Sequence, residues 1–553
     1  MTHGSRHLRG VAVARLLKMP WGTCDATVTL HRVVMRDGAS LLTDVHFPAT
    51  TPDGAALGTV LIRTPYGRRG LLAELTAGWL ASHGYRVVNQ SCRGTAGSGG
   101  TFDPFAQEVD DGADTVSWLR CQPWFDGRFA LWGASYVGHA AWAVMVDPPP
   151  ELAAAVVAVS AHDGHWVAHG AGAFALDEVV GLMDGLAHLD AGPRGLLSAA
   201  SARRRQRPAF EELPLVAAQE TVFADTGMLY RDWLLATDPG DRVWRRMRLG
   251  EALDRVEVPV LLQAGWQDRF STQMFEQHDR LRRRGVVVGL TVGPWTHLQA
   301  ATTGAGILMV EALDWLDEHL AGTDARRPSP VRLFVTGAEE WRDLETWPPP
   351  THEHVLHLHP HGALAEAAPA AGSGPSVFTY NPARPTPAVG GRVTNPAIGG
   401  RRDNRRLEQR DDVLTFTTAP LTEPMEVMGS PAVELFHATD NPYADLFVRL
   451  CEVTEDGRSV NLSDGFRRLG PADANGSVEI SLDAVAHRFN PGVRLRLQVS
   501  GGAHPRYARQ LGTSEGPATS TAMANSHRTI SHGDGGSSRL LLPCLPATPV
   551  ERA

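Results

Sequence analysis

The chain has 553 residues, a formal net charge of −9, 43% hydrophobic residues and 20% charged residues. This length exceeds what one hydrophobic core supports and predicts two to four domains. The composition is that of a globular protein. Because the sequence has no basic stripe, we expect no nucleic-acid partner.

The cysteines argue against a disulfide framework. They are odd in number, widely scattered and without CxxC spacing: Cys24, Cys92, Cys121, Cys451 and Cys544. This pattern predicts neither disulfides nor a zinc site and favours a reducing compartment. The amino-terminal segment lacks the apolar core of a signal peptide, and no apolar run is long enough to span a bilayer. We therefore expect a cytoplasmic protein without a membrane partner.

The amino-terminal half reads as an α/β domain. Residues 27–47 predict a β-hairpin around Asp37-Gly38. Short, almost continuously apolar runs then alternate with helical stretches, at 59–63, 85–90, 128–133, 154–160, 258–265 and 286–293. Such runs are typical of strands buried on both faces of a largely parallel sheet.

Two further segments have different patterns of predicted secondary structure. Residues 165–248 read as helical and irregular, with the clearest helices at 177–189 and 228–236. As an insertion between two sheet strands, this stretch predicts a cap over the carboxyl edge of the sheet, where ligands bind. From residue 326 short strands separated by turn residues predict a β-sandwich or jelly roll, at 331–337, 432–438, 445–453, 493–500 and 538–546. The stretch 362–411 is expected to be a long surface connection.

We therefore predict three parts. Residues 1–164 and 249–325 form the catalytic α/β domain, residues 165–248 form the helical cap, and residues 326–553 form the β jelly roll.

The stretch "GASYVG" (133–138) places Ser135 between a predicted strand and an apolar helix. Gly133 and Gly138 would give clearance where the strand and the helix approach closely. This arrangement is typical of a nucleophile elbow, in which a sharp turn between a strand and a helix exposes the serine above the sheet. Val137 stands where the usual G-x-S-x-G spacing has its second glycine. The competing interpretation is an ordinary serine in a tight turn.

Partners for a nucleophilic serine follow in the order expected for this architecture. Asp268 follows the strand predicted at 258–265, and His297 follows the strand predicted at 286–293. An oxyanion needs two donors, and the backbone N–H of Tyr136 is one by position. The hydroxyl of Tyr66 could be the second, although a tyrosine in a Pro-Tyr-Gly turn is more often structural.

Other candidate motifs carry less weight. The histidines at 352–361 invite a metal interpretation, but no Cys or Asp accompanies them, so we favour a solvated strand. The acids at 108–114 are interpreted as charges that suit a helix N-terminus. Cys92 is not expected to act as a nucleophile, because no base has an obvious place beside it. We expect no metal and no organic cofactor.

The motifs "RTPYG", "NQSCRGTAGSGG", "GASYVG", "GWQD" and "GPWTH", in this order, resemble the CocE/NonD hydrolases. These are α/β-hydrolases similar to cocaine esterase and the X-prolyl dipeptidyl-peptidases. Segments 412–436, 456–468 and 487–500 resemble the carboxyl-terminal jelly roll of that family.

The resemblance implies a nucleophile at Ser135, an acid at Asp268 and a base at His297. It also implies an oxyanion hole made of the Tyr66 hydroxyl and the Tyr136 amide. Ser91 departs from the family, which often has an acid there, and we expect this to affect loop packing or the pocket rather than the triad.

The predicted function is transfer of an acyl group from a small-molecule ester or amide to water. Trp166, Phe270 and Trp295 are candidates for an aromatic acyl pocket. Because Arg269 and Phe270, not further acids, follow Asp268, an α-amino substrate is disfavoured. The alternatives are an X-prolyl dipeptidyl-peptidase, an acyltransferase or cyclase, and a non-catalytic binding scaffold; a homodimer stays open.

Overall fold

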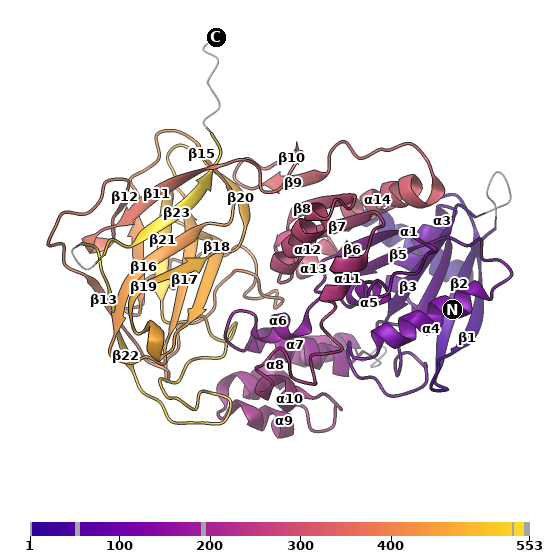
Figure 1. The fold of residues 1–553 in the computed structure, drawn as a ribbon, viewed down its shortest axis with the longest axis horizontal. Coiled ribbons are helices and arrows are strands. Elements are labelled where there is room, and N and C mark those ends of the chain that lie inside the picture. Colours follow the sequence, from indigo (N-terminus) through magenta and orange to yellow (C-terminus); the bar gives the residue numbers. More distant parts are fainter. Residues whose placement is uncertain (1–2, 50–55, 190–194, 534–535, 547–553) are drawn as a thin grey trace, which may run out of the picture. The chain divides into compact units, whose positions relative to one another are not determined.

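A computed structural model describes residues 3–49, 56–189, 195–533 and 536–546 (Figure 1). The chain divides into two units. The first contains Met1–His165, Asp184–Ala202 and Asp238–Val331. The second contains Trp166–Met183, Arg203–Thr237 and Arg332–Ala553. The predicted cap segment is thus shared between the two units, and the three-part domain division stays a prediction.

The first unit is built on a twisted sheet whose strand order is β1-β2-β4-β3-β5-β6-β7-β8. The hairpin predicted around Asp37-Gly38 is confirmed as β1 (Ala26–Val34) and β2 (Ser40–Pro48), which pair antiparallel. The strands from β3 to β8 pair in parallel. Their bounds are β3 (Thr59–Thr64), β4 (Arg86–Ser91), β5 (Phe129–Ala134), β6 (Leu152–Ala158), β7 (Val260–Gln267) and β8 (Val288–Thr296). All six predicted apolar runs are therefore strands, and every residue of β3 and β7 is buried.

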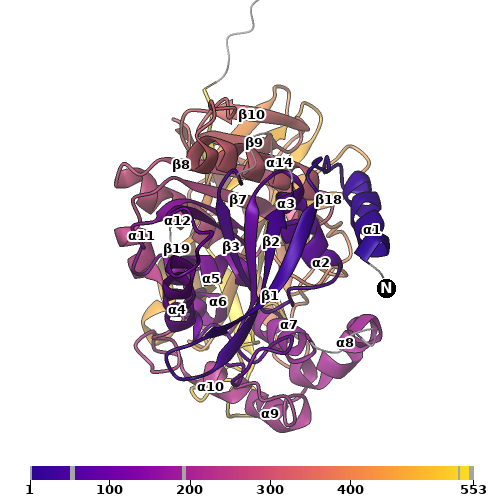
Figure 2. The same ribbon diagram turned by 90° about the vertical axis from the view of Figure 1, so that its right-hand side faces the viewer.

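Helices cover both faces of this sheet. In Figure 2, α4, α11 and α12 lie on one side, and α1, α3 and α14 lie on the other. The second group packs on the sheet through a core that includes Ala14, Trp79 and Trp315. The bounds are α1 (His3–Leu16), α2 (Leu71–Ala73), α3 (Trp79–Ser82), α4 (Glu108–Arg120), α5 (Tyr136–Val144), α11 (Gly250–Arg255), α12 (Ser271–Arg283), α13 (His297–Ala300) and α14 (Ala305–Leu316).

The stretch predicted to be helical between β6 and β7 is helical. It contains α6 (Gly164–His169), α7 (Leu176–Ala187), α8 (Gly195–Glu211), α9 (Ala218–Thr221) and α10 (Tyr230–Leu235). The helices predicted at 177–189 and 228–236 correspond to α7 and α10. Both bring apolar side chains inward, such as Val179 and Val180 on α7 and Trp233 and Leu234 on α10.

Antiparallel sheets make up most of the second unit, as predicted. One sheet has the order β12-β11-β23-β16-β22-β13, with β15, β19 and β20 attached, and the other has the order β14-β21-β17-β18. Side chains from both sheets form one core, for example Leu435 on β16 and Leu497 on β21. The bounds are β9 (Val331–Val335), β10 (Glu340–Leu344), β11 (His352–Leu358), β12 (Leu364–Ala365), β13 (Ser376–Tyr380), β14 (Val413–Thr417), β15 (Met425–Gly429), β16 (Ala432–Thr439), β17 (Asp445–Val453), β18 (Ser459–Arg468), β19 (Asn475–Ser481), β20 (Val485–Phe489), β21 (Arg494–Ser500), β22 (Ser526–Ile530) and β23 (Arg539–Cys544).

The prediction that residues 362–411 form a surface connection is wrong. The stretch contains β13, which pairs with β22, and it buries Asn404 completely. Asn404 Oδ1 accepts a hydrogen bond of 2.8 Å from Arg449, whose guanidinium also pairs with buried Asp464. Because a buried guanidinium needs several acceptors, this stretch of chain is drawn into the core to supply them.

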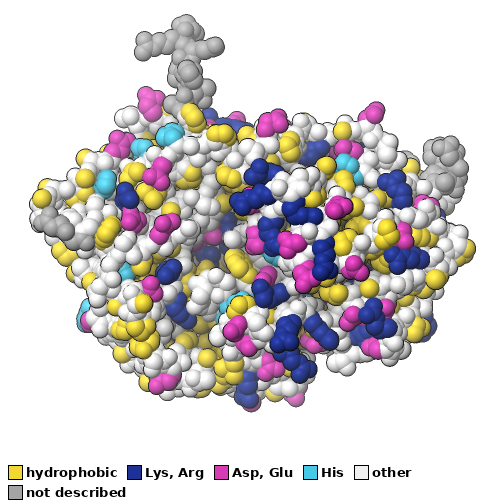
Figure 3. Space-filling model, in the orientation of Figure 1, with side chains coloured by type: hydrophobic (Ala, Val, Ile, Leu, Met, Phe, Trp, Pro, Cys, Tyr) yellow, Lys and Arg dark blue, Asp and Glu magenta, His cyan; other side chains and the backbone are white. Residues whose placement is uncertain are grey.

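Charges of both signs are mixed on the surface. On the face shown in Figure 3, Lys and Arg side chains are interspersed with Asp and Glu side chains. Helix α12 gives a local example, since Arg280 and Arg283 pair with Asp254 and Asp279 respectively. Among the residues that the structure describes, no helix combines the length and apolar character needed to cross a membrane.

Candidate active site

Ser135 occupies a sharp turn between β5 and α5. Its φ of 57° and ψ of −125° lie in a region that non-glycine residues rarely adopt. Its N–H donates to the Ala158 carbonyl at 2.9 Å. Its own carbonyl accepts from the N–H groups of Gly138 and His139 and from the Ser160 hydroxyl at 2.8 Å. Backbone and side-chain hydrogen bonds thus hold the serine in this conformation.

Two glycines create the room for this turn, as the sequence predicts. A Cβ at Gly133 would lie 2.3 Å from the carbonyl oxygen of Val137, a backbone atom that cannot move aside. A Cβ at Gly138 would lie 2.6 Å from the Cβ of Ser160. Only glycine therefore allows α5 to pack this closely on β5 and β6.

His297 and Asp268 lie in line with Ser135. Asp268 directly follows β7 and is fully buried, and His297 begins α13 directly after β8. His297 Nε2 lies 3.0 Å from Ser135 Oγ, and His297 Nδ1 lies 2.7 Å from Asp268 Oδ1. The second carboxylate oxygen of Asp268 accepts the N–H of Phe270 at 3.1 Å. The structure thus brings the three side chains predicted from the sequence into one hydrogen-bonded chain.

Tyr66 reaches the same point from the loop after β3. The Ser135 side chain and the Tyr136 backbone lie beside its phenol, where both act to lower the pKa of that group. Burial raises the pKa of the Tyr66 phenol, so the hydroxyl keeps its proton at neutral pH. A protonated phenol beside the serine is able to donate a hydrogen bond to a negatively charged oxygen.

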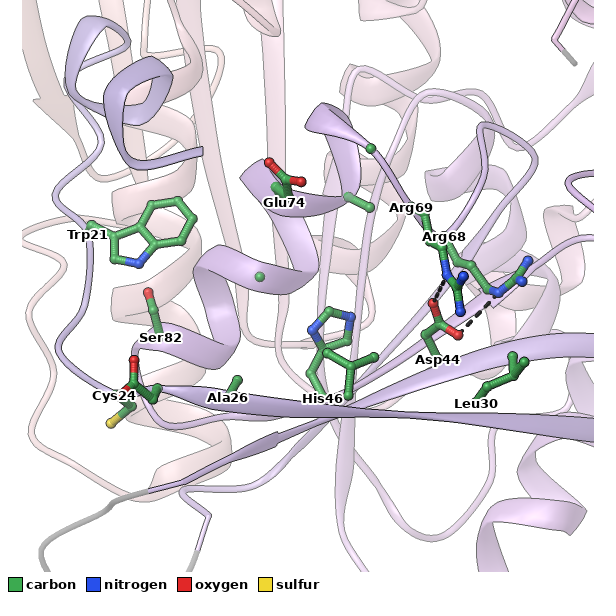
Figure 4. Close-up of a pocket in the computed structure, with 15 residues that line it drawn as sticks. Trp21, Cys24, Ala26, Leu30, Asp44, His46, Arg68, Arg69, Glu74 and Ser82 are labelled. Carbon is green, nitrogen blue, oxygen red and sulfur yellow. Dashed lines mark hydrogen bonds and ion pairs between the residues drawn. The ribbon is translucent and has the colours of Figure 1, made fainter. Parts of the chain in front are cut away.

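An ion cluster anchors the loop that carries Tyr66. Arg68 and Arg69 converge on Asp44 of β2, at 3.2 and 2.9 Å, beside a groove of about 650 Å³ on the outer part of the sheet (Figure 4). Arg68 also donates to the carbonyl of Ala96 at 2.7 Å. Ser91, the predicted departure from the family, is buried, and its hydroxyl lies 3.5 Å from Arg68. Asp44 therefore supplies the carboxylate for this arginine.

The side chain of Tyr136 belongs to a buried network that the sequence analysis missed. Its hydroxyl donates to Glu108 Oε1 at 2.9 Å and accepts the N–H of Phe105 at 2.8 Å. Glu108 and Asp111, interpreted above as helix-end charges, do open α4 but are buried, and they pair with Arg63 and Arg93. The available signal was a polar residue, Arg63, within an otherwise apolar predicted strand, because a buried arginine requires a carboxylate partner.

The three predicted pocket residues have different environments. The Phe270 ring lies edge-on to His297, with ring centroids 5.3 Å apart. The Trp295 ring packs against the backbone of Gly293 and Gly304 and is 5% exposed, so it supports the loop beside His297. Trp166 lies on α6 in the second unit, and its ring packs against Gly170. Their role as an acyl pocket stays a prediction.

The histidine-rich stretch and Cys92 are the remaining candidate motifs, and the structure shows their surroundings. The histidine-rich stretch forms β11, as predicted; His357 pairs with the Ser537 hydroxyl and His359 with the Ala367 carbonyl. Within the described ranges no three His, Cys, Asp or Glu side chains are grouped so that they could hold a metal ion. Burial raises the pKa of the Cys92 thiol well above its ordinary value, which disfavours the reactive thiolate.

Comparison with known proteins covers nearly the whole chain. A model of the S15 family of X-Pro dipeptidyl-peptidases matches residues 37–299, and a model of the X-Pro dipeptidyl-peptidase C-terminal non-catalytic domain matches residues 323–541. Cocaine esterase from Rhodococcus sp. (strain MB1 Bresler) is 30% identical over 535 residues, which are 87% of this chain and 92% of that protein.

Solved structures show the same fold. An α-amino acid ester hydrolase aligns with a TM-score of 0.77 at 22% identity, covering 94% of this chain and 97% of that one. A CocE/NonD family hydrolase from Staphylococcus aureus aligns with a TM-score of 0.69 at 16% identity, covering 97% and 98%. The chain therefore belongs to the CocE/NonD family of serine hydrolases, which act on ester or amide bonds.

Proposed function

We propose that this protein hydrolyses an ester bond of a small acyl substrate through an acyl-enzyme intermediate on Ser135. The observation that carries the proposal is the continuous hydrogen-bonded chain from Ser135 Oγ through His297 to buried Asp268, with distances of 3.0 and 2.7 Å. The constrained φ of Ser135 supports it, because such backbone strain clusters at functional sites.

The roles follow from the geometry. Ser135 Oγ attacks the ester carbonyl while His297 Nε2 takes the hydroxyl proton. Asp268 keeps the other imidazole proton on Nδ1 and stabilises the imidazolium that forms. The Tyr66 hydroxyl and the Tyr136 amide stabilise the oxyanion. The imidazolium then gives its proton to the leaving alcohol, and an acyl-Ser135 ester remains.

The second half of the reaction repeats these steps with water as the nucleophile and Ser135 Oγ as the leaving group. Water attacks the acyl carbonyl, and His297 Nε2 takes a proton from it. Collapse of the second oxyanion breaks the bond to Ser135 Oγ, which recovers its proton from His297. The products are a carboxylic acid and an alcohol, and the enzyme returns to its starting state.

Esters are favoured over X-prolyl amides as substrates. The most extensive sequence likeness reported above is to a protein named cocaine esterase, whereas the S15 model takes its name from X-Pro dipeptidyl-peptidases. Asp268 is followed by Arg269 and Phe270, and the Arg269 guanidinium stacks on the Phe270 ring at 4.2 Å. A cation beside the site disfavours a substrate with a free α-ammonium group.

Active-site labelling tests the proposal. A fluorophosphonate probe should label the wild-type protein and fail to label Ser135→Ala. The matched control is Ser117→Ala, which changes an exposed serine on α4 and should leave labelling unchanged. Labelling that survives in Ser135→Ala contradicts the assignment of the nucleophile.

A substrate panel then separates the reaction classes. We expect p-nitrophenyl esters of small acids to be hydrolysed faster than aminoacyl-proline amides. Faster cleavage of the amides supports the dipeptidyl-peptidase alternative. Labelling of Ser135 together with acyl transfer to an added alcohol or amine, but not to water, supports the acyltransferase alternative.

A further inference from the structure

We propose that Glu108, acting through the phenol of Tyr136, is a positioning residue that aims the Tyr136 amide of the oxyanion hole. The inference rests on the proposed function, because it concerns the same oxyanion hole. Glu108 would touch neither the substrate nor the reacting atoms. Its effect would pass through one residue that carries both the donor amide and a buried hydroxyl.

Tyr136 takes part in two arrangements. Its backbone directly follows Ser135 and lies beside the Tyr66 phenol, whose pKa it lowers. Its side chain is buried, and its hydroxyl is satisfied twice, by Glu108 at 2.9 Å and by the Phe105 N–H at 2.8 Å. The Phe105 ring stacks on the Tyr136 ring at 4.2 Å. The direction of the amide is therefore tied to a fixed side chain rather than to the turn alone.

The anchor is a buried ion pair built into the central sheet. Arg63 of β3 lies 2.8 Å from Glu108 Oε2, and the two side chains are 1% and 3% exposed. Arg63 also donates to Gln90 of β4 at 2.9 Å and to the backbone carbonyl of Glu108. Because the ionised carboxylate accepts stronger hydrogen bonds than a neutral group, the bond from Tyr136 to Glu108 is directional and strong.

Two unusual backbone conformations meet at Tyr136. Ser135, the preceding residue, has a φ of 57°, and Phe105, whose N–H binds the Tyr136 hydroxyl, has a φ of 68°. Non-glycine residues keep such conformations only where the surroundings over-determine them. The Glu108–Tyr136–Phe105 contacts supply this constraint at the residue that must hold an oxyanion donor. The arrangement fits positioning of the amide better than a general contribution to packing.

The test compares two buried tyrosines that donate to buried or half-buried carboxylates. Tyr136→Phe removes the hydroxyl and leaves the Arg63–Glu108 pair in place. The matched control is Tyr85→Phe, because Tyr85 donates to Asp317 at 2.6 Å elsewhere in the same unit. For an ester that the wild-type protein hydrolyses, Tyr136→Phe should lower kcat by about 10- to 100-fold with KM changed less than about two-fold. Tyr85→Phe should lower the melting temperature and leave kcat unchanged.

Variants at Glu108 provide a second measurement. Glu108→Gln keeps a side-chain oxygen for the Tyr136 hydroxyl, whereas Glu108→Ala removes it. We expect kcat of Glu108→Gln to lie closer to the wild-type value than kcat of Glu108→Ala. If the Glu108 variants do not fold, Tyr136→Phe alone decides the question, because it leaves both charges of the buried pair intact.

The outcomes separate this inference from the proposed function. If activity depends on Ser135 but Tyr136→Phe keeps the wild-type kcat, the positioning role is overturned and the proposed function stands. Equal losses of kcat in Tyr136→Phe and Tyr85→Phe also overturn it, since they indicate a general effect of stability. If Ser135→Ala keeps the wild-type activity, the proposed function is contradicted, and the positioning role that rests on it is contradicted as well.

Discussion

Substitution of Gly138 by alanine tests whether close packing of α5 on the sheet keeps Ser135 in place. The added Cβ would lie 2.6 Å from Ser160 Cβ and 2.7 Å from Ser160 Oγ, about 1 Å closer than ordinary van der Waals contact. Because Ser160 Oγ also donates to the Ser135 carbonyl, the clash and the serine turn share one side chain. Relief of the clash must therefore displace either α5 or the Ser135 turn.

The stability and activity of Gly138→Ala should respond differently. Overpacking of a core costs about 1–3 kcal/mol, and alanine recovers about 1 kcal/mol of helix propensity relative to glycine. The net loss of unfolding free energy should thus be about 0–2 kcal/mol. A misplacement of the reacting groups by about 1 Å costs on the order of 10²-fold in rate. We therefore expect kcat to fall by about two orders of magnitude in a protein that still folds.

The assay is steady-state hydrolysis of a p-nitrophenyl ester, with the melting temperature measured alongside. Gly185→Ala on α7 is the matched control, because a Cβ there meets no atom within 4 Å, and it should leave kcat unchanged. The double variant Gly138→Ala/Ser160→Gly removes the clashing side chain and should recover part of the lost activity. A wild-type kcat in Gly138→Ala would refute the idea that this contact limits the geometry of Ser135.

Three further predictions concern the site and its surroundings. Asp268→Asn should lower kcat by about 10⁴-fold, because the amide favours the wrong imidazole tautomer; a mild loss in steady-state kinetics would point to another carboxylate. Tyr66→Phe should lower kcat by about 10²–10³-fold with little change in KM, and an unchanged kcat would remove its hydroxyl from the mechanism.

The third prediction is that the free energy of unfolding falls below neutral pH, because burial lowers the pKa of His278 to about 4 from the ordinary value of 6.5. The unfolded chain binds this proton first, so stability is full above about pH 6.5 and falls between about pH 6.5 and 4. At pH 5 the free energy of unfolding is lower by about 2 kcal/mol. Denaturant titrations at about pH 7.5 and 5 measure this difference, and His278→Gln should reduce the difference by about that amount. An unchanged difference would contradict a buried neutral imidazole.

The elements that place the candidate site were predictable from the sequence because their signals are local. Strands buried on both faces favour apolar residues at nearly every position, so the runs at 59–63 and 258–265 stand out without knowledge of their neighbours. The carboxyl ends of parallel strands meet at one edge of a sheet. Once β5, β7 and β8 were predicted, the meeting of Ser135, Asp268 and His297 followed from their positions just after these strands.

The antiparallel unit was predicted less completely for the same reason. Strands with a strong local apolar signal, such as alternating β16 and fully buried β17, were found individually. Residues 362–411 looked like a surface connection because they are rich in Ala, Pro, Gly and Arg. Their burial depends on Arg449 and Asp464, which lie far along the chain and require acceptors that this stretch supplies.

By itself the sequence determined the strands needed for the site, the turn at Ser135 and the glycines that permit it, since each depends on residues close together in the chain. Only the tertiary structure decided the environment of Glu108. An acidic run at a helix N-terminus has the same sequence pattern whether it is solvated or buried. Glu108 is buried because Arg63, 45 residues earlier, faces it and neutralises its charge. Such a pairing exists only after β3 and α4 pack together, so no local pattern could indicate it.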